Sequence, residues 1–196
     1  NILKKYGIYV QAGYILFDDN TTFEELKENY DFLREYDWII TKGIFSEMFA
    51  ADGTLYTEKL KKEDKIVKND LYDNNKYEIV DPKVKMTYNA LKKWHKSHMK
   101  LYDMIIDPIS SPKAIDSTGE KSFYNLYYQL KLKDLDFMKM VLDNVERGIT
   151  EEELNEKVLT QIRSNSDFYS SINRSGQALC EKYNLNYDGK ENPFIR

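Results

Sequence analysis

The chain has 196 residues, a formal net charge of −4 and 41% hydrophobic residues, which is enough apolar surface for a folded core and argues against general disorder. Acidic and basic residues are interspersed without a basic stripe, so nucleic acid is not an expected partner. Cys180 is the sole cysteine and no apolar run is long enough to cross a bilayer, which excludes a disulfide framework and favours a cytoplasmic chain without membrane contact.

The first part of the chain predicts a helix end, a buried strand and a second helix. Gly7 stands where a glycine closes a helix. The run at residues 8–17 (IYVQAGYILF) is almost wholly apolar, which is typical of a parallel strand buried on both faces. Thr21 and Glu24 have the spacing of a capping box, so a helix is expected over residues 22–35.

A second strand and a short helix follow. The strand is expected within residues 38–50, split or offset around residues 42–43, and the short helix over residues 55–62. Residues 63–80 are polar and irregular, with an edge strand expected at residues 77–80. Alternation of strands and helices predicts a parallel sheet covered by helices.

The second half of the chain predicts long helices. Asp81 and Pro82 form a strong helix start, and Pro108 is expected to stop that helix near residue 106. Thr150 and Glu153 form another capping box. The remaining helices are expected over residues 120–147, from 151 onward and over residues 170–183, and residues 107–119 are expected to form a loop.

Two apolar stripes on these helices favour packing over ligand binding. The only histidines, His95 and His98, lie on a largely apolar stripe, and no acidic residue at an adjacent turn completes a metal site. A second stripe is rich in aromatic residues, which favours a helix–helix core: Phe123, Leu126, Tyr127, Leu130, Phe137 and Met138. Cys180 is expected to be an unreactive packing residue.

Four segments resemble a known enzyme family in their order and spacing. Residues 13–18 (GYILFD) and 21–25 (TTFEE) are followed by residues 52–56 (DGTLY) and by residues 77–82, which lead into a helix that carries a tryptophan. They resemble the C-terminal part of the radical S-adenosylmethionine (radical SAM) fold, in its cobalamin-dependent branch. That branch includes Mg-protoporphyrin IX monomethyl ester oxidative cyclase and other Fe–S oxidoreductases. This sequence has an aspartate at position 52, where the family usually has proline.

The resemblance implies an α/β chain that is predominantly helical by residue count. Residues 1–80 are expected to form the closing βα units of a partial TIM-like barrel, and residues 81–196 a helical extension or cap. Because the chain begins at Asn1 and holds only about two βα units, it is expected to be the closing portion of a larger enzyme, whose remainder is its partner.

The resemblance also implies cofactors and a substrate class. The parent enzyme would use a 4Fe-4S cluster, S-adenosylmethionine and cobalamin on a small-molecule or tetrapyrrole-like substrate. The family holds the cluster in a CxxxCxxC loop, and this sequence lacks that loop. We therefore expect no cofactor to be bound by this chain alone, and no catalysis by it alone.

Cofactor-binding candidates lie on the two expected strands. Gln11 is the only polar side chain of the first strand, which indicates either a nucleoside or substrate contact in a polar barrel interior or a buried, satisfied glutamine. Gly13 would let a ligand approach the backbone, and Ile15 resembles the family position that packs on adenine, with core packing as the alternative. Asp18, at the carboxyl end of the strand, either binds ribose or substrate or accepts turn N–H groups. Glu47 lies in an apolar strand and needs a partner or a wet cavity.

Two other classes of function remain open. The chain is alternatively a non-catalytic binding or oligomerisation module that uses its long C-terminal helices. A half-barrel exposes a sheet edge and an apolar interior, which would favour a homodimer. The third alternative is a stand-alone small α/β binding protein whose similarity to the family is accidental.

Overall fold

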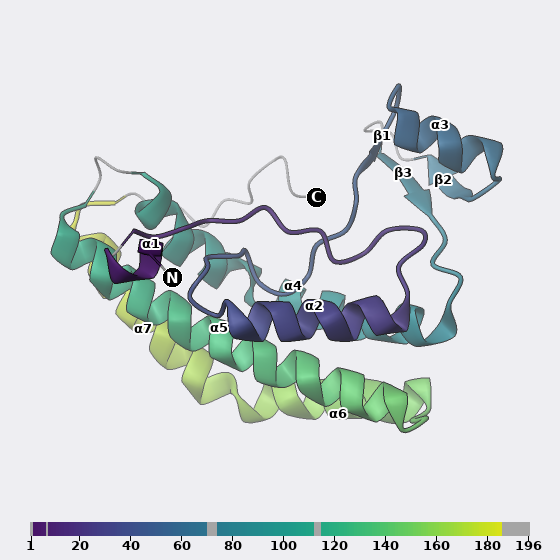
Figure 1. The fold of residues 1–196 in the computed structure, drawn as a ribbon. Coiled ribbons are helices and arrows are strands. Elements are labelled where there is room, and N and C mark those ends of the chain that lie inside the picture. Colours follow the sequence, from purple (N-terminus) through teal and green to yellow (C-terminus); the bar gives the residue numbers. More distant parts are fainter. Residues whose placement is uncertain (1, 7, 70–73, 112–114, 186–196) are drawn as a thin grey trace.

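The computed structural model describes residues 2–6, 8–69, 74–111 and 115–185, and it is predominantly helical, as predicted (Figure 1). Its helices are α1 (Ile2–Lys5), α2 (Phe23–Glu35), α3 (Leu55–Lys62), α4 (Pro82–Ser110), α5 (Ser117–Glu146), α6 (Glu151–Ser164) and α7 (Ser166–Lys182). Its strands are β1 (Ala50–Ala51), β2 (Ile66–Asn69) and β3 (Asn74–Tyr77). The helix end predicted at Gly7 lies outside the described residues, and so do residues 186–196.

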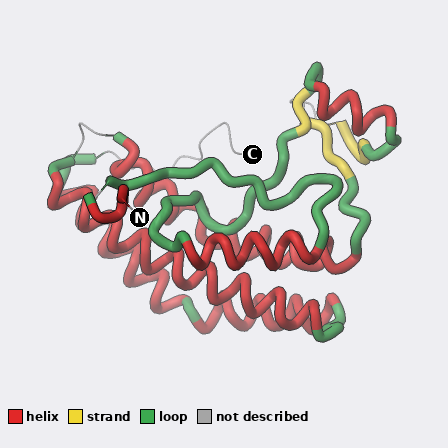
Figure 2. The backbone as a smooth tube through the Cα atoms, in the orientation of Figure 1, coloured by secondary structure: helices red, strands yellow, loops and turns green. Residues whose placement is uncertain are grey.

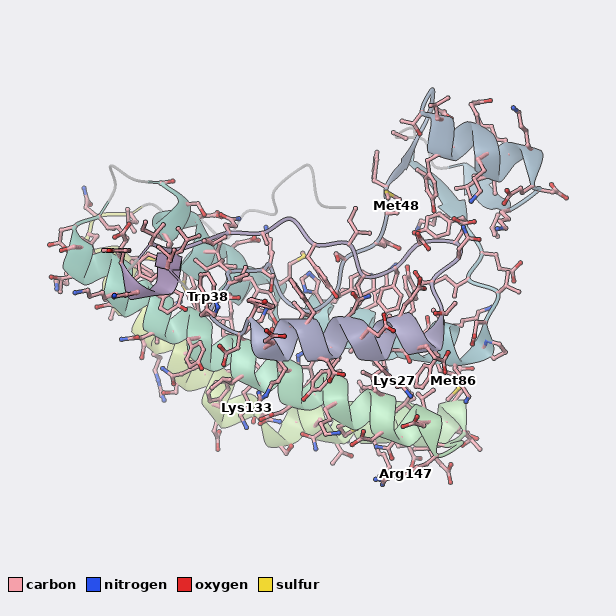
Figure 3. All side chains as sticks on the ribbon, viewed as in Figure 1. Lys27, Trp38, Met48, Met86, Lys133 and Arg147 are labelled. Carbon is pink, nitrogen blue, oxygen red and sulfur yellow. The ribbon has the colours of Figure 1, made fainter. Side chains whose placement is uncertain are left out.

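Helices α4 and α5 form the centre of the molecule. Figure 1 shows α2 lying along α5, with α6 and α7 on the opposite side of α5. Helices α4 and α5 contact each other and each of α2, α6 and α7, and α6 also contacts α7, around one apolar core. On the outer surface, Lys27 of α2, labelled in Figure 3, donates a hydrogen bond of 2.7 Å to Glu146 of α5. No helix in the described part of the chain is both long and apolar enough to span a membrane.

Two extended segments, residues 8–17 and 38–49, run side by side across the helices (Figure 2). They are parallel, and Ala12 N donates to Ile40 O at 2.9 Å while Met48 N donates to Phe17 O at 2.8 Å. The prediction of two regular strands here is wrong, because pairing is limited to two isolated bridges, at Gln11 with Ile40 and at Phe17 with Glu47.

The interruption predicted at residues 42–43 is confirmed and explains why the ladder is broken. The second segment contains one more residue than the first between the two bridges, so it forms a bulge. Gly43 lies in this bulge with a φ of +73°, a conformation that glycine adopts without strain. A bulge separates the two backbones, and the hydrogen bonds of a continuous parallel sheet are lost there.

A small antiparallel sheet lies beyond one end of the segments. Its strand order is β1-β3-β2, so the prediction of irregular chain with an edge strand at residues 77–80 is wrong. Strands β2 and β3 pair antiparallel, with Ile66 opposite Tyr77, although most of their residues are polar and give no strand signal. Asp19 holds this sheet and α3 to the first segment, because its buried carboxylate accepts from Lys65 Nζ at 2.6 Å and from the Tyr56 hydroxyl at 3.1 Å.

Helix boundaries follow the capping residues, with three corrections. Helix α2 has its capping box at Thr22 and Glu25, one residue later than predicted, because the Thr21 hydroxyl is engaged by Asp18 N at 2.8 Å. Helix α4 continues past Pro108, since a proline in the last turn removes a single hydrogen bond and Ile109 is buried.

The third correction concerns the starts of the last helices. Helix α5 begins at Ser117, before the predicted start, because the Asp116 carboxylate accepts from Gly119 N at 2.7 Å and caps it. Helix α7 also begins earlier than predicted, at Ser166. The aromatic stripe of α5 is buried as predicted, and so is Cys180, where burial raises the pKa of the thiol.

Candidate functional site

A hollow of about 320 Å³ opens where the bulge separates the two extended segments. It is lined by residues 11–14 of the first segment, by residues 41–43 and 45–46 of the second, and by His95 of α4. It therefore brings together two predicted site residues, Gln11 and Gly13, with residues that sequence reasoning did not select.

The floor of the hollow depends on the close packing of Gly43. A Cβ at this position would lie 2.6 Å from His95 Nδ1 and 3.2 Å from Tyr102 Cε2. Its N–H donates to Thr41 O at 2.9 Å, which closes a tight turn. Both the positive φ and the lack of space require glycine here.

Helix α5 holds the second segment through phenol groups. The Tyr127 hydroxyl accepts from Thr41 N at 2.8 Å and donates to Ile39 O at 2.8 Å. The Tyr124 hydroxyl donates to Trp38 O at 2.8 Å. These bonds satisfy backbone groups that a continuous sheet would otherwise pair, so α5 determines the path of the segment that lines the hollow.

A buried lysine lies behind the same segment. Lys131 of α5 is 1% exposed, and its Nζ donates to Thr41 Oγ1 at 2.6 Å. The Thr41 hydroxyl in turn donates to Gly43 O at 3.1 Å. Burial lowers the pKa of Lys131 to about 8, against the attraction of Asp134 and Asp37.

A buried carboxylate lies one turn further along α5. Asp134 is 1% exposed and accepts from Trp94 Nε1 at 2.8 Å, and the Tyr102 hydroxyl lies 2.7 and 2.8 Å from its two oxygens. Burial raises the pKa of Asp134 to about 6, although these hydrogen bonds and Lys131 act in the opposite direction. Tyr102 also stacks on His95 with ring centroids 5.4 Å apart, which links the carboxylate to the hollow.

Two polar side chains that line the hollow have buried atoms without a hydrogen-bond partner among the described residues. These atoms are His95 Nδ1 and the Tyr14 hydroxyl. Burial lowers the pKa of His95 to about 4, and nearby Lys42 lowers it further, so the imidazole is neutral at neutral pH. The hollow is thus uncharged at His95, and its two buried polar atoms have no hydrogen-bond partner among the described residues, which calls for an explanation.

The first segment presents its predicted candidates to solvent. Gln11 is exposed, and its Oε1 accepts from the Ser110 hydroxyl at 2.7 Å. A Cβ at Gly13 would meet nothing within 4 Å, so the hollow is open there. Ile15 is 53% exposed. The alternatives of a buried glutamine at position 11 and core packing at position 15 are therefore wrong.

The other two candidates lie outside this hollow. Asp18 Oδ1 accepts from Asn20 N at 2.9 Å, which is the turn contact named as its alternative role, and Asp18 and Ile15 line a separate hollow of about 280 Å³. The Glu47 carboxylate accepts from the Tyr88 hydroxyl at 2.5 Å and pairs with Lys92 at 3.5 Å. Glu47 is exposed, so its pairing is not the burial of a charge that its apolar neighbours in the sequence implied.

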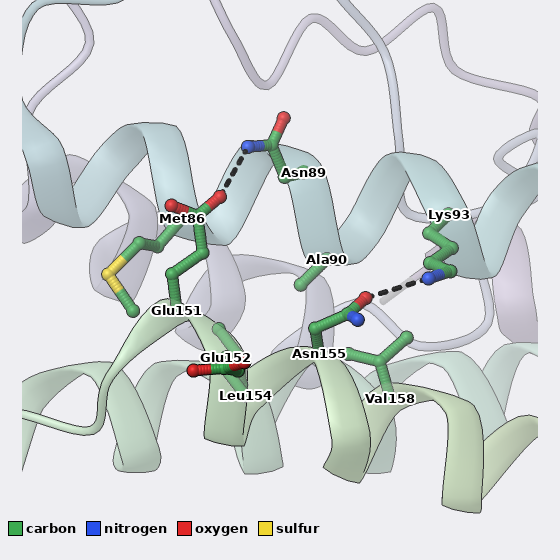
Figure 4. Close-up of a pocket in the computed structure, with 9 residues that line it drawn as sticks. All are labelled: Met86, Asn89, Ala90, Lys93, Glu151, Glu152, Leu154, Asn155 and Val158. Atoms are coloured by element: carbon green, nitrogen blue, oxygen red, sulfur yellow. Dashed lines mark hydrogen bonds between the residues drawn. The ribbon is translucent and has the colours of Figure 1, made fainter.

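A larger groove of about 420 Å³ lies between α4 and α6 (Figure 4). There Asn89 Nδ2 donates to Glu151 at 3.3 Å and Lys93 Nζ donates to Asn155 Oδ1 at 2.7 Å, as the dashed lines show. Its polar groups bond one another across the groove. The hollow at Gln11 and His95 is the stronger candidate, since its buried polar atoms lack partners.

Sequence reasoning missed Lys131 and Asp134, although a signal for them was present. Both fall on the aromatic stripe of α5, one helical turn after Tyr127 and Leu130, where an uncharged residue is expected. Charged residues on a buried stripe indicate a polar network. Thr41 carries no comparable signal, because a threonine is ordinary in an extended segment.

The chain does not fit the cluster that the family resemblance implies. A 4Fe-4S cluster takes several cysteine thiolates, and the sequence offers Cys180 alone, buried on α7. Within the described ranges, no group of three or more His, Cys, Asp or Glu side chains is arranged to hold a metal ion. Comparison with protein-family models, curated proteins and solved structures finds no match to this chain.

Proposed function

We propose that the chain is the C-terminal part of a radical SAM enzyme of the cobalamin-dependent branch, an Fe–S oxidoreductase or methyltransferase. In this role it contributes part of the adenosine or substrate pocket and is not catalytic alone. The sequence resemblance of residues 13–18, 21–25 and 52–56 supports the family. The parallel direction of the two extended segments, joined by α2, supports a partial TIM-like barrel.

The observation that carries the proposal is the hollow at the bulge. It opens between the two parallel segments at the bulge, and Gly13 leaves its backbone open to a ligand. Gln11 offers a side-chain N–H donor, because its oxygen is the atom that Ser110 engages. The cluster, and the cobalamin of the parent, would be held by the remainder of that enzyme.

Binding of S-adenosylmethionine to the chain tests this function. Although no cofactor is expected to stay bound to this chain alone, a partial pocket should contact S-adenosylmethionine weakly, so we expect the amide NMR shifts of residues 11 and 13 to change on its addition at millimolar concentration. Gly13→Leu adds a side chain where the structure has open space, so it should fold normally and abolish the change. Ala178→Leu, on the exposed face of α7, is the matched control and should bind as the wild type does. Equal binding by both variants, or none by the wild type, contradicts the proposal.

A second candidate function is assembly through the extended segments. Ile8, Ile15 and Phe49 are 51%, 53% and 58% exposed on these segments, whereas no large apolar side chain of α4 to α7 is comparably exposed among the described residues. This favours a homodimer through the half-barrel face over one through the long helices.

Light scattering over a range of protein concentrations distinguishes this candidate. A homodimer through the extended segments should dissociate in Ile15→Lys, because a charge would be buried at the interface. Leu55→Lys, at a side chain that is 91% exposed on α3, is the control and should stay dimeric. A wild-type chain that is monomeric at every concentration contradicts the assembly function.

A further inference from the structure

The buried ammonium of Lys131 has too few acceptors. It carries three N–H donors, and among the described residues only Thr41 Oγ1, at 2.6 Å, accepts from it. No ion pair within 4.0 Å joins it to a carboxylate in this part of the chain. A charge buried in this way depends strongly on its single contact.

Thr41 connects that contact to the hollow. When Lys131 is an ammonium, it donates to Thr41 Oγ1, so the single hydroxyl hydrogen of Thr41 points to Gly43 O, 3.1 Å away. When Lys131 loses a proton to solvent, its amine nitrogen becomes an acceptor. The neutral amine keeps two N–H donors but gains a lone pair, so the Thr41 hydroxyl can turn to donate to that nitrogen, and Gly43 O then loses its bond. The two protonation states therefore hold Gly43 differently.

We propose that Lys131 is a positioning residue of the hollow and that its protonation state is transmitted through the Thr41 hydroxyl to the bulge at Gly43. The hollow would keep its observed shape while Lys131 is charged. Its rim at Gly43 would be held less firmly once Lys131 is neutral. A consequence for ligand affinity rests on the binding function proposed above. The positioning role itself does not need a ligand.

Among the titratable groups around it, Lys131 is the one whose charge changes between neutral and mildly alkaline pH. Burial lowers the pKa of Lys131 to about 8 and raises that of Asp134 to about 6. Burial also lowers the pKa of each of the two α4 histidines to about 4 and raises those of the tyrosines. The titratable side chains that face this region come from four parts of the chain: Asp37 and Lys42 in and next to the second segment, His95, His98, Tyr102 and Asp103 of α4, Tyr127 and Asp134 of α5, and Tyr169 of α7.

An NMR pH titration of the ligand-free chain tests the proposal. The amide of Gly43 and the side-chain carbon next to the Lys131 nitrogen should titrate together, with a midpoint of about 8. In Thr41→Val, which keeps the shape of the side chain but lacks the hydroxyl, the lysine should still titrate while Gly43 does not respond. Thr41→Ser should restore the response of Gly43.

Two results would overturn the proposal. One is a Gly43 response that persists in Thr41→Val or in Lys131→Met. The other is a wild-type Gly43 amide that does not change while Lys131 titrates. If Lys131→Met fails to fold, the two Thr41 variants still test whether the Gly43 response depends on the Thr41 hydroxyl. A coupled titration without any binding of S-adenosylmethionine would keep the positioning role and reject the function proposed above.

Discussion

Gly43 and His95 are packed so closely that a Cβ added to Gly43 would lie 2.6 Å from His95 Nδ1. The imidazole is flanked by two rings, with centroid distances of 5.9 Å to Phe45 and 5.4 Å to Tyr102. This contact joins the bulge of the second extended segment to α4. The geometry of the hollow therefore depends on a residue that carries no side chain.

The first prediction concerns Gly43→Ala. We expect it to lower the free energy of unfolding by about 2 to 4 kcal/mol, the sum of a left-handed conformation at a residue with a Cβ and of overpacking against His95. Urea denaturation measures this loss. Gly13→Ala is the control, since a Cβ at position 13 meets nothing within 4 Å, and its effect should stay within about 0.5 kcal/mol. Equal effects of the two substitutions would reject this account of the bulge.

The second prediction concerns Tyr127→Phe. It leaves Thr41 N and Ile39 O without their partner, so the amide hydrogen of Thr41 should exchange faster and stability should fall by about 1 to 3 kcal/mol. Hydrogen exchange followed by NMR measures the first effect. Tyr124→Phe removes a single bond, to Trp38 O, and should leave the exchange of Thr41 unchanged. Slow exchange of Thr41 in Tyr127→Phe would show that the phenol does not hold the segment.

The third prediction is a loss of stability in acid. His95 and His98 have folded-state pKa values of about 4, mainly because both are buried, and their unfolded value is about 6.5. Between pH values of about 4 and 6.5 the unfolded chain binds more protons than the folded protein does. The stabilising contribution of the two neutral histidines is therefore complete above a pH of about 6.5 and is lost as the pH falls toward 4. Asp134 acts in the opposite direction below a pH of about 6. Because its pKa is raised, the folded protein binds a proton there at a higher pH than the unfolded chain does.

His98→Phe separates the contributions. The variant keeps an aromatic ring stacked on Tyr169, where the His98 ring centroid is 3.5 Å away, but it cannot bind a proton. Between pH values of about 6.5 and 4, its free energy of unfolding should fall less steeply than that of the wild type, by up to about 1.4 kcal/mol per pH unit. Urea denaturation at a series of pH values measures the slope. An unchanged slope would mean that His98 binds a proton as readily in the folded protein as in the unfolded chain.

Local signals explain which elements the sequence predicts well. Asp81 and Pro82 start α4, and Thr150 and Glu153 cap α6, as predicted, because a cap depends on residues within one turn. The start of α2 is wrong by one residue, since Thr21 and Thr22 compete for the capping position and Asp18 engages the first of them.

Non-local contacts explain the rest. An apolar run predicts extended chain at residues 8–17, but whether it pairs as a strand depends on the bulge in another segment. Gln11 and Gly13 are candidates that one expected strand supplies, and both line the hollow. The network behind them was not, because Lys131 and Asp134 come from α5, far along the chain, and spacing alone does not show what they face.

The last prediction concerns the buried carboxylate. Tyr102→Phe removes the hydroxyl that lies against both oxygens of Asp134, so the pKa of Asp134 should rise above about 6 and stability at neutral pH should fall by about 1.5 to 3 kcal/mol. The loss should be smaller at pH 5, where Asp134 is protonated in the wild type as well. Carboxyl NMR shifts and urea denaturation measure the two effects. Tyr169→Phe is the matched control, because the buried Tyr169 hydroxyl has no hydrogen-bond partner among the described residues and its removal should cost little. Equal losses in the two variants would mean that removal of a buried hydroxyl, and not of its bond to Asp134, accounts for the effect.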